Sequence, residues 1–96
     1  MKVHWTDEAL AELRAIRAYL NHYSAEAAYT TVSRIIISAG RLAELPHSGH
    51  VLREFNQSDL RELLIRPYRI IYRILADRID IITVWHYRRL LPHHLT

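Results

Sequence analysis

Apolar residues recur every three or four positions over the first half of the chain, which is the spacing of amphipathic helices. Thr6 can cap a first helix over residues 7–20, and Ser24 can cap a second over residues 24–44. Because the link between them is short, the two helices are expected to form an antiparallel hairpin. The side chains predicted to pack on the rest of the protein are Leu10, Leu13, Ile16, Leu20, Val32, Ile35 and Leu42.

Beyond a turn predicted at residues 46–50, the period of the apolar positions changes from helical to two. The segment 79–86 does not alternate cleanly, and a bulge near Thr83 would explain this. The pattern predicts an α+β fold with an N-terminal strand, an antiparallel helical hairpin and a three-stranded antiparallel meander. Both helices are expected to cover one face of this small sheet. The predicted strands are residues 2–6, 61–66, 69–74 and 79–86.

Three details of packing follow from the same pattern. Gly40 lies inside the second predicted helix, where it costs about 1 kcal/mol relative to Ala, so we expect a close contact or a bend there. Tyr68 and Tyr72 are expected to pack with Trp85. His86 lies on an apolar strand, where a histidine is more often structural than a proton shuttle, and we expect a structural role.

Length and composition indicate one folded domain over residues 1–96 with a single modest core. Half of the residues are apolar, and there is no Cys, which excludes disulfides and thiolate metal sites. No segment has the ~20 uninterrupted apolar residues of a membrane span, and the N-terminus lacks the apolar stretch of a signal peptide. We therefore expect a cytoplasmic protein without a membrane partner.

Positive charge is concentrated toward the C-terminus. Residues 1–60 carry six Lys or Arg and seven Asp or Glu, whereas residues 61–96 carry seven Arg and three acids. Arginine binds carboxylates and phosphates through two parallel hydrogen bonds, so this half of the chain is suited to a macromolecular contact surface. A solvated sheet face with long aliphatic stems is an equally simple interpretation.

Short motifs spread along nearly the whole chain resemble the ParE/RelE superfamily of toxins, often labelled plasmid-stabilisation proteins, and the ParE branch most closely. The order and spacing of these motifs carry the resemblance more than any one of them does. One departure is His50, because the family usually has Arg after the Gly of this turn. The matching residues are Val3-His4-Trp5-Thr6 with Ala9 and Leu13, Leu45-Pro46 with Ser48-Gly49, residues 51–54, Leu60-Arg61-Glu62-Leu63, Tyr68-Arg69-Ile70 with Tyr72, and Val84 with His86 and Arg89.

The resemblance implies a type II toxin that an acidic, ParD-like antitoxin neutralises, within a toxin–antitoxin hetero-oligomer. It leaves two targets open. ParE-like members act on DNA gyrase without cleaving RNA, whereas RelE-like members are ribosome-dependent messenger RNA endoribonucleases. We expect the gyrase-directed function, which needs no catalytic residues and no cofactor.

Chemistry distinguishes the two functions. RNA cleavage requires a base for the 2′-OH, a cation at the phosphate and a proton donor for the leaving oxygen. The resemblance places Arg69 and Arg89 at the phosphate, with Glu54 or His86 as base or acid. Glu62 argues against this site, because a carboxylate facing the phosphate would repel it. Arg69 can instead pair with Glu62 or Glu54 across the sheet.

Two binding surfaces follow as expectations. The target is expected to contact Arg88, Arg89, His93 and His94 of the basic tail, where Pro92 interrupts any regular strand. An apolar groove between hairpin and sheet, bordered by Arg61, Arg69 and Arg73, is expected to receive an acidic antitoxin segment that folds on binding. A third alternative is a basic nucleic-acid-binding domain that contacts phosphates directly. The histidines at 47, 50, 86, 93 and 94 impose no metal-binding geometry, and no metal site is expected.

Overall fold

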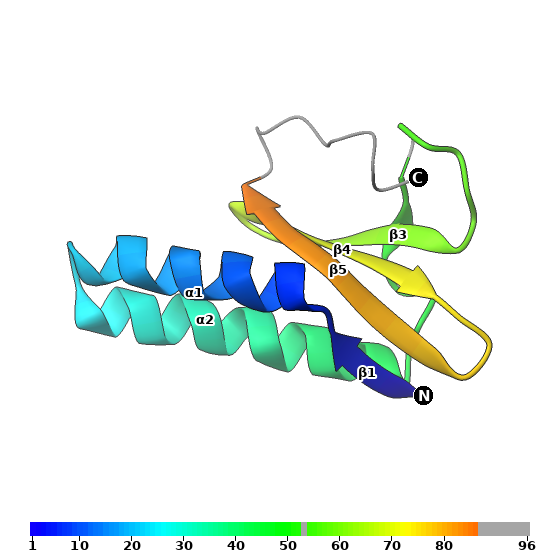
Figure 1. Ribbon diagram of the computed structural model, residues 1–96, viewed down its shortest axis with the longest axis horizontal. Coiled ribbons are helices and arrows are strands. Elements are labelled where there is room, and N and C mark those ends of the chain that lie inside the picture. Colours follow the sequence, from blue (N-terminus) through cyan, green and yellow to red (C-terminus); the bar gives the residue numbers. More distant parts are fainter. Residues whose placement is uncertain (53, 87–96) are drawn as a thin grey trace.

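Both helices begin at the predicted capping residues. The computed structural model describes residues 1–52 and 54–86 and shows α1 (Asp7–Asn21) and α2 (Ala25–Gly40) as an antiparallel pair (Figure 1). The Thr6 Oγ1 accepts a hydrogen bond from the Ala9 N–H at 3.2 Å, and the Ser24 Oγ accepts one from the Ala27 N–H at 3.1 Å. These bonds satisfy N–H groups that have no partner inside the helix, and they confirm both predicted starts.

The second helix ends earlier than predicted. A short 3₁₀ turn, η1 (Arg41–Ala43), replaces the last turn expected up to residue 44. Gly40 is the last residue of α2, and a Cβ added there would meet no atom within 4 Å. Of the close contact or bend expected at Gly40, the close contact is absent, and the chain changes there from α2 to η1.

The strands form one five-stranded sheet in the order β1-β5-β4-β3-β2. The predicted meander is confirmed, because β3, β4 and β5 pair antiparallel in chain order. Two further strands extend it: β1 lies parallel to β5, and the short β2 pairs with β3 at the end of the segment predicted as a turn. The sheet is therefore mixed, and the helical hairpin connects β1 to the strands that follow. Its strands are β1 (Lys2–Trp5), β2 (His50–Val51), β3 (Leu60–Ile65), β4 (Tyr68–Ile74) and β5 (Arg78–His86).

A bulge in β5 explains why its apolar residues do not alternate. Ile71 pairs with Thr83, but the next residue of β4, Tyr72, pairs with Ile81, so Ile82 is the extra residue. The hydroxyl of Thr6 lies 2.7 Å from the Ile81 carbonyl oxygen and 3.0 Å from that of Ile82. One side chain therefore caps α1 and holds the bulge, which confirms the bulge predicted near Thr83.

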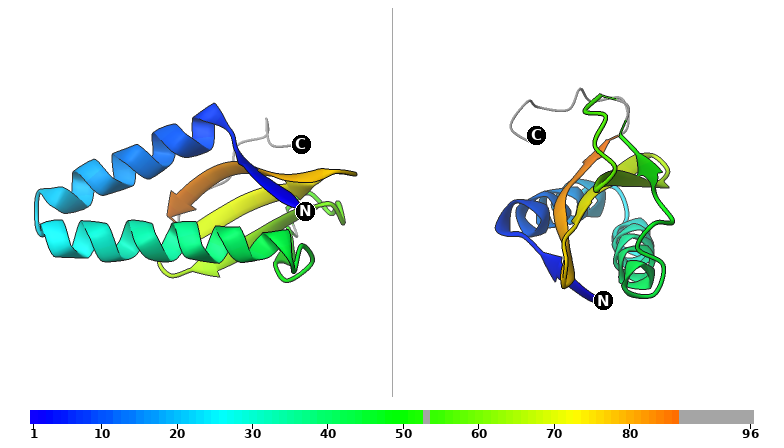
Figure 2. Two further views of the ribbon diagram at one scale, coloured as in Figure 1. Left: turned by 90° about the horizontal axis from the view of Figure 1, so that it is seen from below. Right: turned by 90° about the vertical axis from the view of Figure 1, so that its right-hand side faces the viewer.

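The main core lies between the hairpin and one face of the sheet, with α1 along β5 and α2 along β3 (Figure 2). The end of the hairpin projects beyond the sheet (Figure 1). No helix within the described residues is long and apolar enough to cross a membrane. The fully buried apolar residues of this core are Ala9, Ile35, Ala39, Leu42, Ile70, Tyr72, Ile79, Ile81 and Val84, and Leu13 and Tyr68 are nearly so.

Leu10 does not belong to this core, contrary to the prediction, because its side chain is exposed. The inward face of α1 begins at Ala9 instead, and Leu13 and Ile16 continue it. A residue as small as Ala9 allows the helix backbone to approach the sheet, so a count of large apolar residues misses it.

The opposite face of the sheet, which we call the outer face, carries a smaller apolar cluster of Leu52, Leu60 and Ile71. Cross-strand pairing places Trp85 beside Arg69 on this outer face. Because side chains alternate along β4, Tyr68 and Tyr72 lie on the other side. The expected packing of these tyrosines with Trp85 is therefore wrong.

Candidate functional site

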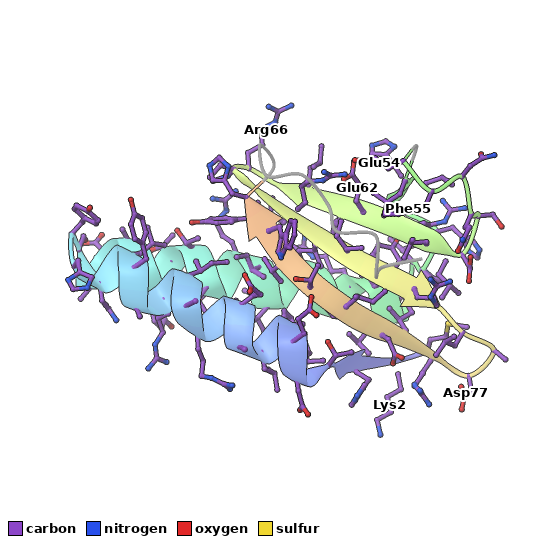
Figure 3. All side chains as sticks on the ribbon, turned by 45° about the horizontal axis from the view of Figure 1, so that its top comes forward. Lys2, Glu54, Phe55, Glu62, Arg66 and Asp77 are labelled. Carbon is purple, nitrogen blue, oxygen red and sulfur yellow. The ribbon has the colours of Figure 1, made fainter. Side chains whose placement is uncertain are left out.

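A polar cleft on the outer face is built around Arg69. The Arg69 side chain is about 10% exposed and binds two carboxylates: its Nε donates to Glu62 Oε2 at 2.5 Å, and its Nη2 donates to Glu54 Oε2 at 3.1 Å. Glu62 belongs to β3 and Glu54 to the loop after β2 (Figure 3). The predicted pairing of Arg69 with these acids is confirmed, and the cluster of one cation and two anions has a formal charge of −1.

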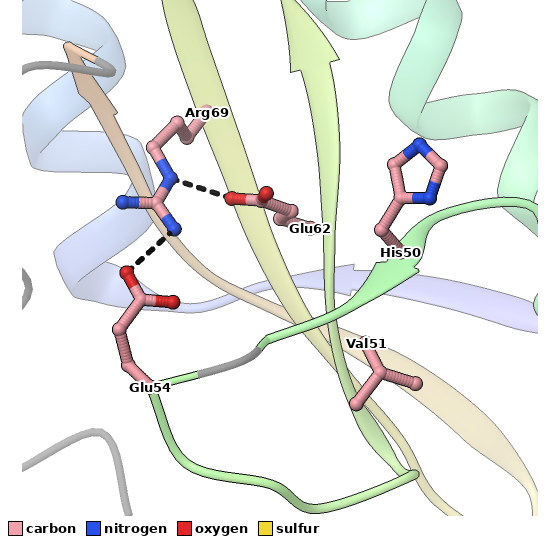
Figure 4. Close-up of a pocket in the computed structure, with 5 residues that line it drawn as sticks. All are labelled: His50, Val51, Glu54, Glu62 and Arg69. Carbon is pink, nitrogen blue, oxygen red and sulfur yellow. Dashed lines mark hydrogen bonds and ion pairs between the residues drawn. The ribbon is translucent and has the colours of Figure 1, made fainter.

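An open cleft of about 660 Å³ adjoins these three side chains, and His50 and Val51 of β2 form its other wall (Figure 4). We call this the Arg69 cleft. A buried guanidinium that already binds two carboxylates has its charge satisfied within the protein. The free space therefore lies beside an ion-pair cluster and not beside an exposed cation.

A hydrogen-bonded lock holds the loop that leads into the cleft. The Tyr72 hydroxyl donates to the Pro46 carbonyl oxygen at 2.8 Å and accepts from the Gly49 N–H at 2.9 Å. Arg61 adds a bond from its Nη1 to the Gly49 carbonyl oxygen at 2.9 Å. Burial raises the pKa of the Tyr72 hydroxyl, while the Gly49 hydrogen bond and the Arg61 charge act in the opposite direction. The lock fixes residues 46–49 immediately before β2.

Gly49 is required here for space. A Cβ at this position would lie 2.5 Å from both the Glu62 carbonyl oxygen and the Tyr72 hydroxyl oxygen, closer than side chains can approach. The sequence showed Gly49 only as part of a turn, and it gave no role to the Tyr72 hydroxyl. The one signal available was that a buried tyrosine usually finds a hydrogen-bond partner.

The three arginines expected to border one groove do not lie together. Arg61 is on the helix side of β3, whereas Arg69 and Arg73 are on the outer face of β4. Arg73 forms an ion pair with Asp59 at 2.7 Å, so it is engaged within the protein as Arg69 is. Their expected arrangement around one antitoxin groove is therefore wrong, although any contact of each with an antitoxin stays a prediction.

An apolar groove between hairpin and sheet does exist, but none of those arginines borders it. It measures about 330 Å³, and burial raises the pKa of the Tyr68 hydroxyl in its wall. The residues that line it are Glu12, Ala15, Ile16, Tyr19, Tyr68, Val84 and His86.

The residues of the ribonuclease alternative are only partly brought together. Arg69 and Glu54 are in contact, but His86 lies on the helix side of β5, where its ring meets Tyr68 edge-on at 6.0 Å between centroids. Arg89 lies outside the described residues, and so do the expected target contacts Arg88, His93 and His94. Within the described residues, no three His, Asp or Glu side chains are grouped as metal ligands.

Comparison with known proteins gives the family. Residues 3–91 match the sequence model of the ParE toxin of the type II toxin–antitoxin system, parDE. The chain is 37% identical over 90 residues to toxin RelE2 of Caulobacter vibrioides, covering 93% of this chain and 98% of RelE2. It is 38% identical over 96 residues to the protein named Y4kP of Sinorhizobium fredii, covering 98% of this chain and 96% of that protein.

A solved structure of the chromosomal ParDE TA system from P. aeruginosa has the same fold. The TM-score is 0.73 at 27% sequence identity, and the match covers 90% of this chain and 95% of that chain. The family match spans nearly the whole chain, and the elements that carry it are those of the described fold. The chain therefore belongs to the ParE toxin family, within the ParE/RelE superfamily of type II toxin–antitoxin toxins.

Proposed function

We propose that this toxin inhibits DNA gyrase by binding it and that it does not cleave RNA. The observation that carries the proposal is the state of Arg69, the cation that an RNase of this superfamily would place at the scissile phosphate. Its guanidinium is bound by Glu62 and Glu54, and His86 lies on the other face of the sheet.

The electrostatics support this choice. A base, a cation and an acid must surround one phosphate for the 2′-OH to cleave RNA. At the Arg69 cleft a phosphate would meet one positive and two negative side chains, a formal charge of −1. Repulsion from the two carboxylates offsets the attraction to the guanidinium. Direct phosphate binding over the sheet is disfavoured for the same reason, since Arg73 and Arg78 also form ion pairs with carboxylates.

The partners follow from the family. A toxin of a type II system implies an antitoxin, and we propose an acidic, ParD-like one that forms a hetero-oligomer with the toxin in the cytoplasm. The basic tail, with Arg88, Arg89, His93 and His94, is the proposed gyrase contact. Arginine can bind a large partner through contacts to carboxylates or phosphates, and no covalent bond needs to be made or broken. In this proposal residues 1–96 act as one domain.

Two assays test the proposal. Purified toxin added to gyrase and relaxed plasmid should reduce supercoiling or trap cleaved DNA. The double variant Arg88→Ala with Arg89→Ala should weaken that effect. Its matched control is Arg14→Ala with Arg17→Ala, which removes the same charge from exposed positions of α1 and should leave inhibition unchanged.

A translating-ribosome assay addresses the alternative. The proposal expects no new cuts within messenger RNA codons. Cleavage of the messenger with gyrase unaffected would instead favour the RNase function, which the likeness to toxin RelE2 keeps as the second candidate. Arg69, Glu54, His86 and Arg89 would then be the first residues to substitute.

A further inference from the structure

The two ion pairs of Arg69 differ in how firmly their carboxylates are held. Glu62 lies on β3, which is paired with strands on both sides, and its side chain is 18% exposed at 2.5 Å from the Arg69 Nε. Glu54 lies on the loop between β2 and β3, and its side chain is 47% exposed at 3.1 Å from the Arg69 Nη2. Glu62 therefore orients the guanidinium, whereas Glu54 covers its outer edge.

Glu54 can leave Arg69 without unfolding its loop. The next residue, Phe55, packs on the outer-face cluster of Leu52, Leu60 and Ile71. The backbone is held as well, because the Asn56 N–H donates to the Leu52 carbonyl oxygen at 3.0 Å. These contacts anchor the loop around Glu54, so rotation of one half-exposed side chain is enough to uncover Arg69 (Figures 3 and 4). An exposed ion pair opposes that rotation only weakly.

We infer that the Nη edge of Arg69 is a carboxylate-binding site, which Glu54 fills in the free toxin and a carboxylate of the partner's acidic segment takes over. This inference rests on the antitoxin partner of the proposed function. The Nη edge is suited to a carboxylate, because Glu62 accepts a hydrogen bond only from the Nε. A guanidinium can bind a carboxylate through two parallel hydrogen bonds. Among the described residues, the Nη1 of Arg69 has no hydrogen-bond acceptor.

A carboxylate fits the site better than a nucleic-acid phosphate does. Exchange of one carboxylate for another leaves the formal charge at the guanidinium unchanged. The site already holds a carboxylate, because the Glu54 Oε2 lies 3.1 Å from the Nη2 of Arg69. The Arg69 cleft gives the incoming side chain room, because about 660 Å³ beside His50 and Val51 is open (Figure 4).

The test is a titration of the purified full-length toxin with an acetylated octaglutamate peptide amide at low salt. The readout is the Nε–H signal of Arg69 in ¹⁵N NMR, assigned by its loss in Arg69→Lys. Glu54→Gln removes the internal competitor and should tighten binding at this signal roughly two- to fivefold. The matched control is Asp59→Asn, which removes one negative charge from the same loop at a similar exposure of 45% and should leave the Arg69 affinity as in the wild type.

Three outcomes would overturn the inference. Equal tightening in Glu54→Gln and Asp59→Asn would mean that net charge alone controls binding. A larger response to an eight-nucleotide oligouridylate than to the peptide would assign the site to phosphates. Loss of folding in both Glu54→Gln and Glu54→Ala, followed by circular dichroism, would make Glu54 a structural residue. The supercoiling assay is independent of this titration, so failure here leaves the gyrase proposal intact and failure there leaves this inference intact.

Discussion

Tyr72→Phe removes one oxygen atom from the centre of the lock and leaves the ring in place. The wild-type side chain is fully buried, and its hydroxyl joins the Gly49 N–H to the Pro46 carbonyl oxygen at 2.9 and 2.8 Å. Phenylalanine fills nearly the same volume, so the cavity term of a core truncation is small. The variant therefore isolates the energy of the two hydrogen bonds.

The buried Gly49 N–H, which loses its acceptor in Tyr72→Phe, determines how much stability the variant loses. A buried donor that loses its only acceptor costs about 1–3 kcal/mol. The Pro46 carbonyl is only half-buried, so water can replace the lost donor there at little cost. We expect the free energy of unfolding to fall by about 1–3 kcal/mol, and each kcal/mol lowers Tm by about 4–8 °C in a domain of this length.

Urea denaturation followed by tryptophan fluorescence measures this change, since Trp5 and Trp85 are both at least half-buried. The matched control is Tyr29→Phe, which removes the same hydroxyl from a side chain that is 76% exposed on α2. The control should move the unfolding free energy by less than about 0.5 kcal/mol. If Tyr72→Phe moves the midpoint no further than the control does, the Tyr72 hydroxyl does not hold the loop.

Three further predictions concern the packing and the buried tyrosines. Leu13→Ala truncates a buried residue and should cost about 2–5 kcal/mol in the same denaturation assay, whereas an unmoved midpoint would mean that the inward face of α1 is misassigned. Gly49→Ala should destabilise by about 1–3 kcal/mol through overpacking, while Gly40→Ala, in helical geometry with open space, should stabilise by about 0.5–1 kcal/mol; thermal melts of the two variants should shift in opposite directions. Because burial raises the pKa of Tyr68 and Tyr72 above 10, stability should be complete below pH 10 and decline as pH rises through the folded-state values, and a constant midpoint up to pH 12 would contradict this.

The sequence by itself determined the local elements of this protein. Caps at Thr6 and Ser24, a period of three to four followed by a period of two, and one break in alternation near Thr83 predict both helices, the meander and the bulge. These features depend on neighbours within a few residues, so they can be predicted from the sequence alone. The pairing of Arg69 with Glu62 or Glu54 was also predicted, from their opposite charges and from the expectation that their segments meet in the sheet, and the structure has both pairs.

Tertiary structure alone decided which elements meet and which face each residue occupies. The alternation at residues 2–6 predicts a strand but not its parallel pairing with β5, which depends on the path of the hairpin. Arg61 and Arg73 lie on opposite faces because β3 and β4 pair in one particular register, and a shift of one residue would reverse that. Gly49 and the Tyr72 hydroxyl are 23 positions apart in the chain, so their contact exists only once β2, β3 and β4 are assembled.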